Sequence, residues 1–119
     1  MKTIIAGSRS IIDINQVIFA VHDSGFLPDI TEIVSGGAPG IDRLAIDYAK
    51  TNHIPCKTMP ANWDKYGKRM AGLVRNGEMA QYADALIAIW DGRSRGTYHM
   101  IETAQRLNLK VFIYKVKNA

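Results

Sequence analysis

Residues 32–40 read Glu32-Ile33-Val34-Ser35-Gly36-Gly37-Ala38-Pro39-Gly40, an apolar run that ends in a glycine-rich turn. A short apolar run of this kind is typical of a buried strand. Pro39 suits the first turn of a helix, because its missing N–H group would have no partner there. An apolar stripe at helical spacing follows, made of Ile41, Leu44, Ala45 and Tyr48. The stretch therefore predicts a strand, a tight turn and a helix in direct succession.

The same alternation of apolar runs and amphipathic stripes extends along the whole chain. Strands are expected at residues 3–6, 32–34, 54–59, 85–90 and 111–114. Helices are expected around residues 14–21, 39–52, 70–77 and 97–107, and residues 63–67 are expected to form a loop. Pro55 and Pro60 limit the ladder bonding of the third strand and favour an edge position. The pattern predicts an α/β fold, a three-layer sandwich of about five largely parallel strands with helices on both faces. Residues 1–119 are expected to form one domain.

Composition excludes several classes of protein. The 119 residues include 15 Lys and Arg, 11 Asp and Glu, and one cysteine, Cys56, so an internal disulfide and a thiolate metal cluster are ruled out. The histidines lack metal-ligand spacing, and we expect neither a metal nor another cofactor. No apolar run approaches the roughly 20 residues of a membrane span, and no signal peptide is recognisable, which predicts a cytoplasmic protein. A net charge of +4 is compatible with a nucleotide or nucleic acid as partner.

The loops that follow the expected strands are rich in glycine, hydroxyl and arginine side chains. In parallel sheets, ligands bind beyond the carboxyl ends of the strands, where the strand order reverses. The loops at that edge are Gly7-Ser8-Arg9, residues 35–40, residues 60–67 and residues 91–97. Glycines let the backbone approach an anion, and a helix N-terminus offers free N–H groups. This edge is predicted to bind phosphate, although each glycine turn is also compatible with ordinary strand-to-helix geometry.

Several side chains near this edge allow two interpretations. Arg9 can pair with a phosphate or hold a neighbouring loop through a salt bridge. Arg75 and Asn76 fit a ligand site or a solvated helix face, and Trp63, like the neighbouring Tyr66, can stack on a base or cap the core. Asp42 is a candidate acid or base, but the helix dipole alone would favour an acid in a first turn. The candidate ligand-binding residues are Gly7, Ser8, Arg9, Ser35, Gly36, Gly37, Asp42, Trp63, Arg75, Asn76, Gly92, Ser94, Gly96 and Thr97.

These motifs carry a family resemblance over nearly the whole chain. The stretches Ala6-Gly7-Ser8-Arg9, residues 34–42, Pro60-Ala61-Asn62-Trp63, Arg75-Asn76 and residues 91–97 closely resemble the YspA-like, cpYpsA-related branch of the SLOG superfamily. The resemblance implies a Rossmann-like fold and a homo-oligomer. It also implies a nucleotide-derived ligand, such as a nucleotide or an ADP-ribose-like molecule, that the protein would sense or sequester.

A more distant resemblance points to the LOG phosphoribohydrolases, which release a base from a nucleoside monophosphate. Arg75 and Gly96-Thr97 match their arginine and Gly-Thr-x-x-Glu pattern, but Met100 occupies the glutamate position. A thioether cannot act as an acid or a base as a carboxylate does. The resemblance therefore implies N-glycosidase activity, with Arg75 as a catalytic residue, only if another carboxylate such as Asp91 substitutes.

Another distant resemblance is to the Rossmann-like domain of the DNA-processing proteins DprA. Their Gly-Ser-Arg, Ser-Gly-x-Ala-x-Gly-Ile-Asp and Arg-Asn stretches appear here as Gly7-Ser8-Arg9, residues 35–42 and Arg75-Asn76. This resemblance implies single-stranded DNA as an alternative partner, which the basic balance and Trp63 would suit.

Overall fold

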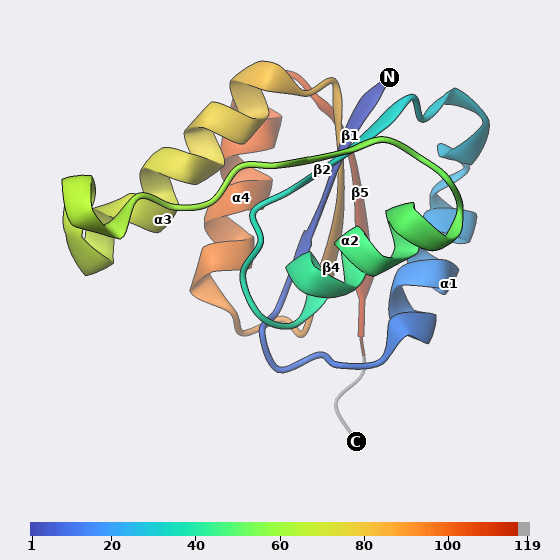
Figure 1. The fold of residues 1–119 in the computed structure, drawn as a ribbon, viewed down its shortest axis with the longest axis horizontal. Helices are drawn as coiled ribbons and strands as arrows, with labels where there is room; N and C mark the ends of the chain where they lie inside the picture. The colour runs from blue at the N-terminus through green and yellow to red at the C-terminus, as the bar shows by residue number, and fades with distance from the viewer. Residues whose placement is uncertain (117–119) are drawn as a thin grey trace.

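The computed structural model describes residues 1–116 and contains a five-stranded sheet with helices between the strands (Figure 1). All strand pairs are parallel. The strands and helices are, in chain order, β1 Lys2–Gly7, α1 Ile14–Ser24, the 3-10 helix η1 Leu27–Asp29, β2 Glu32–Ser35, α2 Ile41–Thr51, β3 Cys56–Thr58, α3 Trp63–Tyr82, β4 Ala85–Trp90, α4 Arg95–Arg106 and β5 Lys110–Lys115. The prediction of an α/β fold with five parallel strands is confirmed.

The strand order is β3-β2-β1-β4-β5. From β1 the chain moves outward to β2 and β3, then crosses back through α3 to β4, which pairs with β1 on the other side. The sheet therefore reverses its direction of winding between β1 and β4. In folds of this kind the carboxyl ends of those two strands flank the usual ligand crevice.

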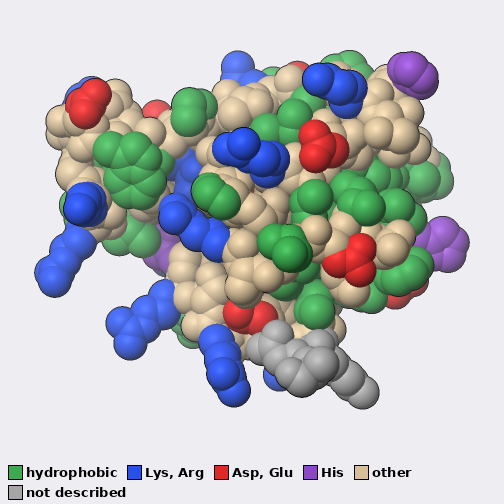
Figure 2. Space-filling view, turned by 60° about the horizontal axis from the view of Figure 1, so that its bottom comes forward, with side chains coloured by type: hydrophobic (Ala, Val, Ile, Leu, Met, Phe, Trp, Pro, Cys, Tyr) green, Lys and Arg blue, Asp and Glu red, His purple; other side chains and the backbone are tan. Residues whose placement is uncertain are grey.

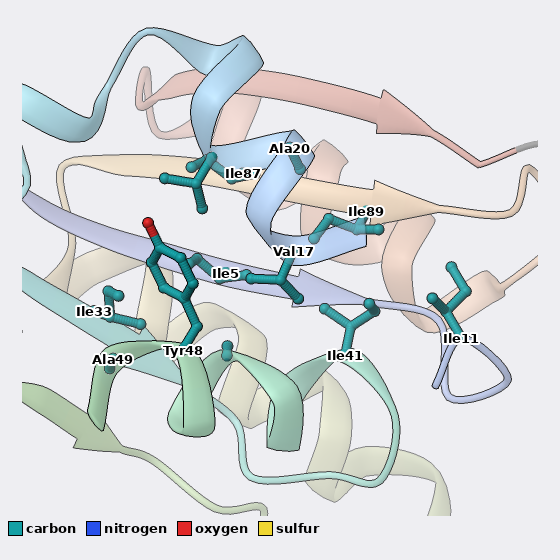
Figure 3. Packing of buried hydrophobic residues seen from close by; sticks show 12 residues of the cluster. Ile5, Ile11, Val17, Ala20, Ile33, Ile41, Tyr48, Ala49, Ile87 and Ile89 are labelled. Atoms are coloured by element: carbon teal, nitrogen blue, oxygen red, sulfur yellow. The ribbon is translucent and has the colours of Figure 1, made fainter. Parts of the chain in front are cut away.

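Alternate residues of β1, β2 and β4 face two separate helix layers. Ile5, Ile33, Ile87 and Ile89 pack with α1 and α2, where Val17, Ile41 and Tyr48 meet them (Figure 3). On the other face, Ile4, Val34, Leu86 and Ala88 pack with Met79 and Ala80 of α3 and with Met100 and Ile101 of α4. The period of two along each strand produces both cores, and the predicted three-layer sandwich is confirmed.

The structure corrects the prediction at three places. Residues 63–67 do not form a loop, because Asn62 caps a helical turn through its Oδ1, which accepts a hydrogen bond from Lys65 N at 3.1 Å. The helix is then interrupted at Gly67, whose φ of 77° and ψ of 173° are not helical. The third strand is shorter than expected, but it does lie at an edge of the sheet. The helix α4 begins at Arg95 rather than Thr97, because Ser94 is its N-cap.

Among residues 1–116, no helix is both long enough and apolar enough to span a bilayer.

Candidate functional site

A cavity of about 470 Å³ lies at the carboxyl ends of β1 and β4, where the winding of the sheet reverses. We call it the main cavity. Its apolar wall includes Ala6, Leu73, Met79 and Met100. Its polar wall comes from the loops after β1, β2 and β4 and from the helices α2 and α3. Figure 2 brings this edge forward and shows Lys and Arg side chains gathered around it. The volume is within the range of about 300–1,000 Å³ that is usual for small-molecule sites.

A smaller cavity of about 230 Å³ adjoins the first, and we call it the side cavity. Its walls are the glycine-rich loop after β2 and the segment Pro60-Ala61 that precedes α3. Four residues line both cavities, namely Arg9, Ala38, Trp63 and Arg75. The two cavities therefore adjoin each other, and we call these four residues their shared wall.

Most of the predicted site residues meet at these cavities. Those that line the main cavity are Gly7, Ser8, Arg9, Asp42, Trp63, Arg75, Asn76, Asp91, Ser94, Gly96 and Thr97, and Gly36 and Gly37 line the side cavity. Ser35 and Gly92 line neither. Ser35 is fully buried, and its Oγ donates to Asp42 O at 2.7 Å and accepts from Gly37 N at 3.2 Å, which shapes the loop. Gly92 has a φ of 83° and lies against the side chain of Lys115.

Arg75 and Asn76 connect the loop after β2 to the start of α4. Arg75 Nη1 donates to Gly36 O at 2.9 Å, and Arg75 Nε donates to Asn76 Oδ1 at 3.1 Å. Asn76 is 6% exposed, and its Nδ2 donates to Gly96 O at 3.4 Å. The interpretation of these residues as a solvated helix face is therefore wrong. Two loops from opposite sides of the reversal point are held together by adjacent side chains of α3.

Asp42 is a buried carboxylate in the wall of the main cavity. It is 6% exposed, and its Oδ2 accepts a hydrogen bond from Ala38 N at 3.3 Å. Burial raises the pKa of Asp42, while the nearby Arg75 guanidinium and the backbone N–H groups oppose that shift. Asp42 therefore does more than interact favourably with the helix dipole. It fixes the loop after β2 and adds a negative charge beside Arg75.

Asp91 holds the loop between β4 and α4. Its Oδ1 accepts hydrogen bonds from Arg93 N and Ser94 N, both at 2.8 Å, and these bonds lower the pKa of Asp91. Ser8 Oγ accepts from Asp91 N at 3.2 Å, so the loop is also tied to the end of β1. A carboxylate that is stabilised in its charged form is a poor proton donor near neutral pH. This geometry favours a structural role for Asp91.

Arg9 and Trp63 expose their side chains at the rim. Within residues 1–116, no carboxylate oxygen lies within 4 Å of the Arg9 guanidinium, so the salt-bridge interpretation of Arg9 has no partner there. Trp63 is 47% exposed and Tyr66 is 37% exposed. The interpretation that these aromatic side chains cap the core is wrong, and both remain available to a ligand.

The face of α3 toward the main cavity was only partly anticipated from the sequence. Besides Arg75 and Asn76, it contributes Arg69, Gly72, Leu73 and Met79. These residues are three, four or seven positions from Asn76, so helical spacing from Asn76 would have identified them. Over the described range 1–116, no group of three or more His, Cys, Asp or Glu side chains is placed to hold a metal ion.

Comparison with known proteins identifies a family and a structural likeness. Residues 1–66 match the profile of the family described as YspA, cpYpsA-related SLOG. The chain is 33% identical over 117 residues to the Gene 61 protein of Mycobacterium phage D29, covering 92% of this chain and 93% of that protein.

Two solved structures of DNA processing protein A share the fold. The Streptococcus pneumoniae protein superposes with a TM-score of 0.73 at 20% identity over 94% of this chain, and the Helicobacter pylori protein with 0.64 at 20% identity over 95%. The chain spans 49% and 64% of those two proteins. The second was described for its single-stranded DNA binding mode.

Proposed function

The chain belongs to the YspA, cpYpsA-related SLOG family, and from that premise we propose that it binds a nucleotide or an ADP-ribose-like derivative in the main cavity. The protein would act as a sensor of this ligand or would sequester it. The observation that carries the proposal is the position of Arg9 and Arg75 in the wall of a cavity at the reversal point of the sheet.

The charge of the main cavity favours an anion. Its wall holds Arg9, Arg69 and Arg75 against the two carboxylates Asp42 and Asp91. Three guanidinium groups against two carboxylates leave an excess of one positive charge in this wall. Guanidinium groups bind phosphate oxygens in a bidentate manner, which makes a phosphorylated ligand the best match.

The start of α4 adds backbone donors to the same wall. Ser94 Oγ accepts from Thr97 N at 3.3 Å and from Thr97 Oγ1 at 3.0 Å, which fixes the first turn. The earliest N–H groups of a helix have no acceptor inside the helix, and the dipole there attracts negative charge. Gly96 lines the cavity without a side chain to block the approach of a phosphate.

The remaining walls suit the less polar part of a nucleotide. Leu73, Met79 and Met100 give the cavity apolar lining, and the half-exposed Trp63 also lines it. A base needs apolar or aromatic contact on its faces, and a phosphate needs donors. The main cavity offers both within one enclosure.

A thermal-shift screen tests this proposal. The ligands are AMP, cyclic AMP, NAD and ADP-ribose, with ribose 5-phosphate and inorganic phosphate for comparison. A ligand at 100 times its Kd stabilises a protein by about 2.7 kcal/mol, which gives a readily measured rise in Tm. We expect a rise with at least one nucleotide and none with inorganic phosphate at the same concentration. The absence of a shift with every nucleotide would overturn the proposal.

Single-stranded DNA is the second candidate, favoured by the exposed first turns of α3. Trp63 and Tyr66 are exposed there beside the exposed basic residues Lys65, Lys68 and Arg69, and bases stack on such aromatic side chains while cations contact the phosphates. The DNA-binding description of the Helicobacter pylori protein is consistent with this alternative. Oligonucleotide affinity that falls steeply with salt and resists competition by mononucleotides would support it.

A homo-oligomer and a cytoplasmic location are further proposals drawn from the family resemblance and the composition. Light scattering on the purified chain tests the first, because a monomer mass of 13.2 kDa is distinguished directly from its multiples. Fractionation of cells that make the protein tests the second.

A further inference from the structure

We propose that the site binds a two-part ligand joined by a diphosphate bridge, with a nucleoside in the main cavity and a sugar-sized group in the side cavity. This inference rests on the proposed function and narrows the ligand class to that of ADP-ribose. It comes from the shared wall of the two cavities, which contains both Arg9 and Arg75.

The sizes of the two cavities determine which part of the ligand each cavity can hold. The main cavity measures about 470 Å³, and the side cavity measures about 230 Å³. The smaller value is below the range of about 300 Å³ and upward that is usual for complete small-molecule sites. The side cavity therefore suits one ring with its substituents, such as a pentose, and the main cavity suits the base and its sugar.

The two arginines at the junction are not neutralised by ion pairing in the described part of the chain. No carboxylate oxygen of residues 1–116 lies within 4 Å of either guanidinium. Burial and the like charge of Arg9 lower the pKa of Arg75, while Asp42 raises it, so the two cations affect each other. A diphosphate carries a negative charge on each phosphate, and one placed at this junction would relieve the repulsion of both arginines.

The loop after β2 holds the Arg75 guanidinium close to its backbone at the junction of the two cavities. A Cβ on Gly36 would stand 2.3 Å from Arg75 Nη1 and 2.8 Å from Asp42 Oδ2, so only glycine lets both side chains approach this point. Arg75 uses one hydrogen of Nη1 on Gly36 O and the hydrogen of Nε on Asn76. A guanidinium has five N–H donors, so three remain for an anion.

Trp63 stands where a bridged ligand would pass from one compartment to the other. Its side chain lines both cavities and is 47% exposed. Pro60 and Ala61, just before it, form the wall of the side cavity alone, because neither lines the main cavity. A substitution at Ala61 therefore changes the side cavity and leaves the lining residues of the main cavity as they are.

Isothermal titration with ADP-ribose and AMP tests the inference on the wild type, on Ala61→Phe and on the control Gln105→Phe. We expect the wild type to bind ADP-ribose at least about tenfold more tightly than AMP, because only ADP-ribose reaches the side cavity. In Ala61→Phe the phenyl ring would fill that cavity and bring ADP-ribose to the affinity of AMP, with AMP unchanged. Gln105→Phe adds the same ring on the exposed face of α4, lines neither cavity, and should behave as the wild type.

The wild-type comparison is decisive even if Ala61→Phe does not fold. Equal affinities for AMP and ADP-ribose would overturn the two-part ligand and leave the proposed nucleotide binding intact. Equal weakening of both ligands in a folded Ala61→Phe variant would also overturn it, because the side cavity would then not be a separate compartment. Binding of neither ligand would overturn the inference, and the thermal-shift screen with cyclic AMP and NAD would then decide the proposed function.

Discussion

Arg75 Nη1 lies 2.9 Å from the carbonyl oxygen of Gly36, although 39 positions separate the two residues in the chain. The next residue, Asn76, donates to Gly96 O at 3.4 Å. Two neighbouring positions of α3 thus hold the loop after β2 and the start of α4 in fixed positions. The same guanidinium faces both cavities, so it combines a structural contact with a ligand contact.

Arg75→Ala is expected to weaken nucleotide binding by about 10-fold to 200-fold, the effect of losing a charge-assisted hydrogen bond of about 1.5–3 kcal/mol. The Arg75→Lys variant should also bind the nucleotide weakly. The lysine ammonium is a single point charge and cannot contact Gly36 O and a phosphate at the same time, as the planar guanidinium can. Titration calorimetry measures both. Arg106→Ala is the control, since Arg106 is exposed in the last turn of α4, and it should bind as the wild type. Retained affinity in Arg75→Ala would contradict the assignment.

Gly36→Ala is expected to impair ligand binding by displacing Arg75. The new methyl group would stand 2.3 Å from Arg75 Nη1, far inside van der Waals contact, so the guanidinium has to move. Gly77→Ala is the matched control, because a Cβ at Gly77 in α3 meets no atom within 4 Å. That change should leave affinity unaltered and raise stability by about 0.5–1 kcal/mol, the usual preference for alanine in a helix. Calorimetry and thermal unfolding of the two variants test both statements.

Asp91→Asn is expected to change how stability depends on pH. Hydrogen bonds from Ser94 N and Arg93 N lower the folded-state pKa of Asp91, so its charge stabilises the fold above the unfolded value of about 3.9. This contribution is lost as the pH falls through the folded-state value. The Tm difference between wild type and Asp91→Asn should therefore be constant at neutral pH and should shrink below about pH 4.

Asp47→Asn controls for the general loss of a carboxylate, since Asp47 is exposed on α2. We expect its Tm at neutral pH to stay close to that of the wild type, as is usual for a substitution at an exposed position. A Tm difference for Asp91→Asn that stays the same down to the lowest pH would mean that the charge of Asp91 adds nothing to stability.

The layers of the fold were predictable from the sequence because the apolar pattern reports burial directly. Residues 85–90 are an uninterrupted apolar run, and they form the interior strand β4, which is covered on both faces. The start of α3 was not predictable from that pattern. Residues 63–67 bury no apolar face, and their helical turn depends on the cap at Asn62 and the break at Gly67. Local hydrogen bonding, rather than hydrophobic spacing, determines that turn.

The site was predictable to the extent that the loops after parallel strands share one edge. Glycine-rich loops identified Gly36 and Gly96, which lie in neighbouring walls of the two cavities. The role of Ser35 was not visible, because only the folded loop shows its Oγ bonded to Asp42 O rather than open to a ligand. Arg69 was missed because a single arginine on an exposed helix turn carries no distinctive signal.

The wild-type protein is expected to hydrolyse AMP to adenine and ribose 5-phosphate at well below about 1 per second, a low rate for an enzyme. Met100 is 1% exposed in the apolar wall of the main cavity, and its thioether cannot transfer a proton. Asp91 is bonded to backbone N–H groups, so it does not replace the missing acid. Chromatographic assay of released adenine measures the rate.

Met100→Glu would place a carboxylate in that wall and is expected to raise adenine release by about 100-fold, the usual scale of an acid–base contribution. Met100→Gln, which has a similar shape and no acid, should remain as slow as the wild type. Circular dichroism and thermal unfolding have to show that both variants are folded, because a buried carboxyl group is costly. Rapid turnover by the wild type would contradict the binding function, and Asp42→Asn compared with Asp91→Asn would then identify which cavity carboxylate supplies the proton.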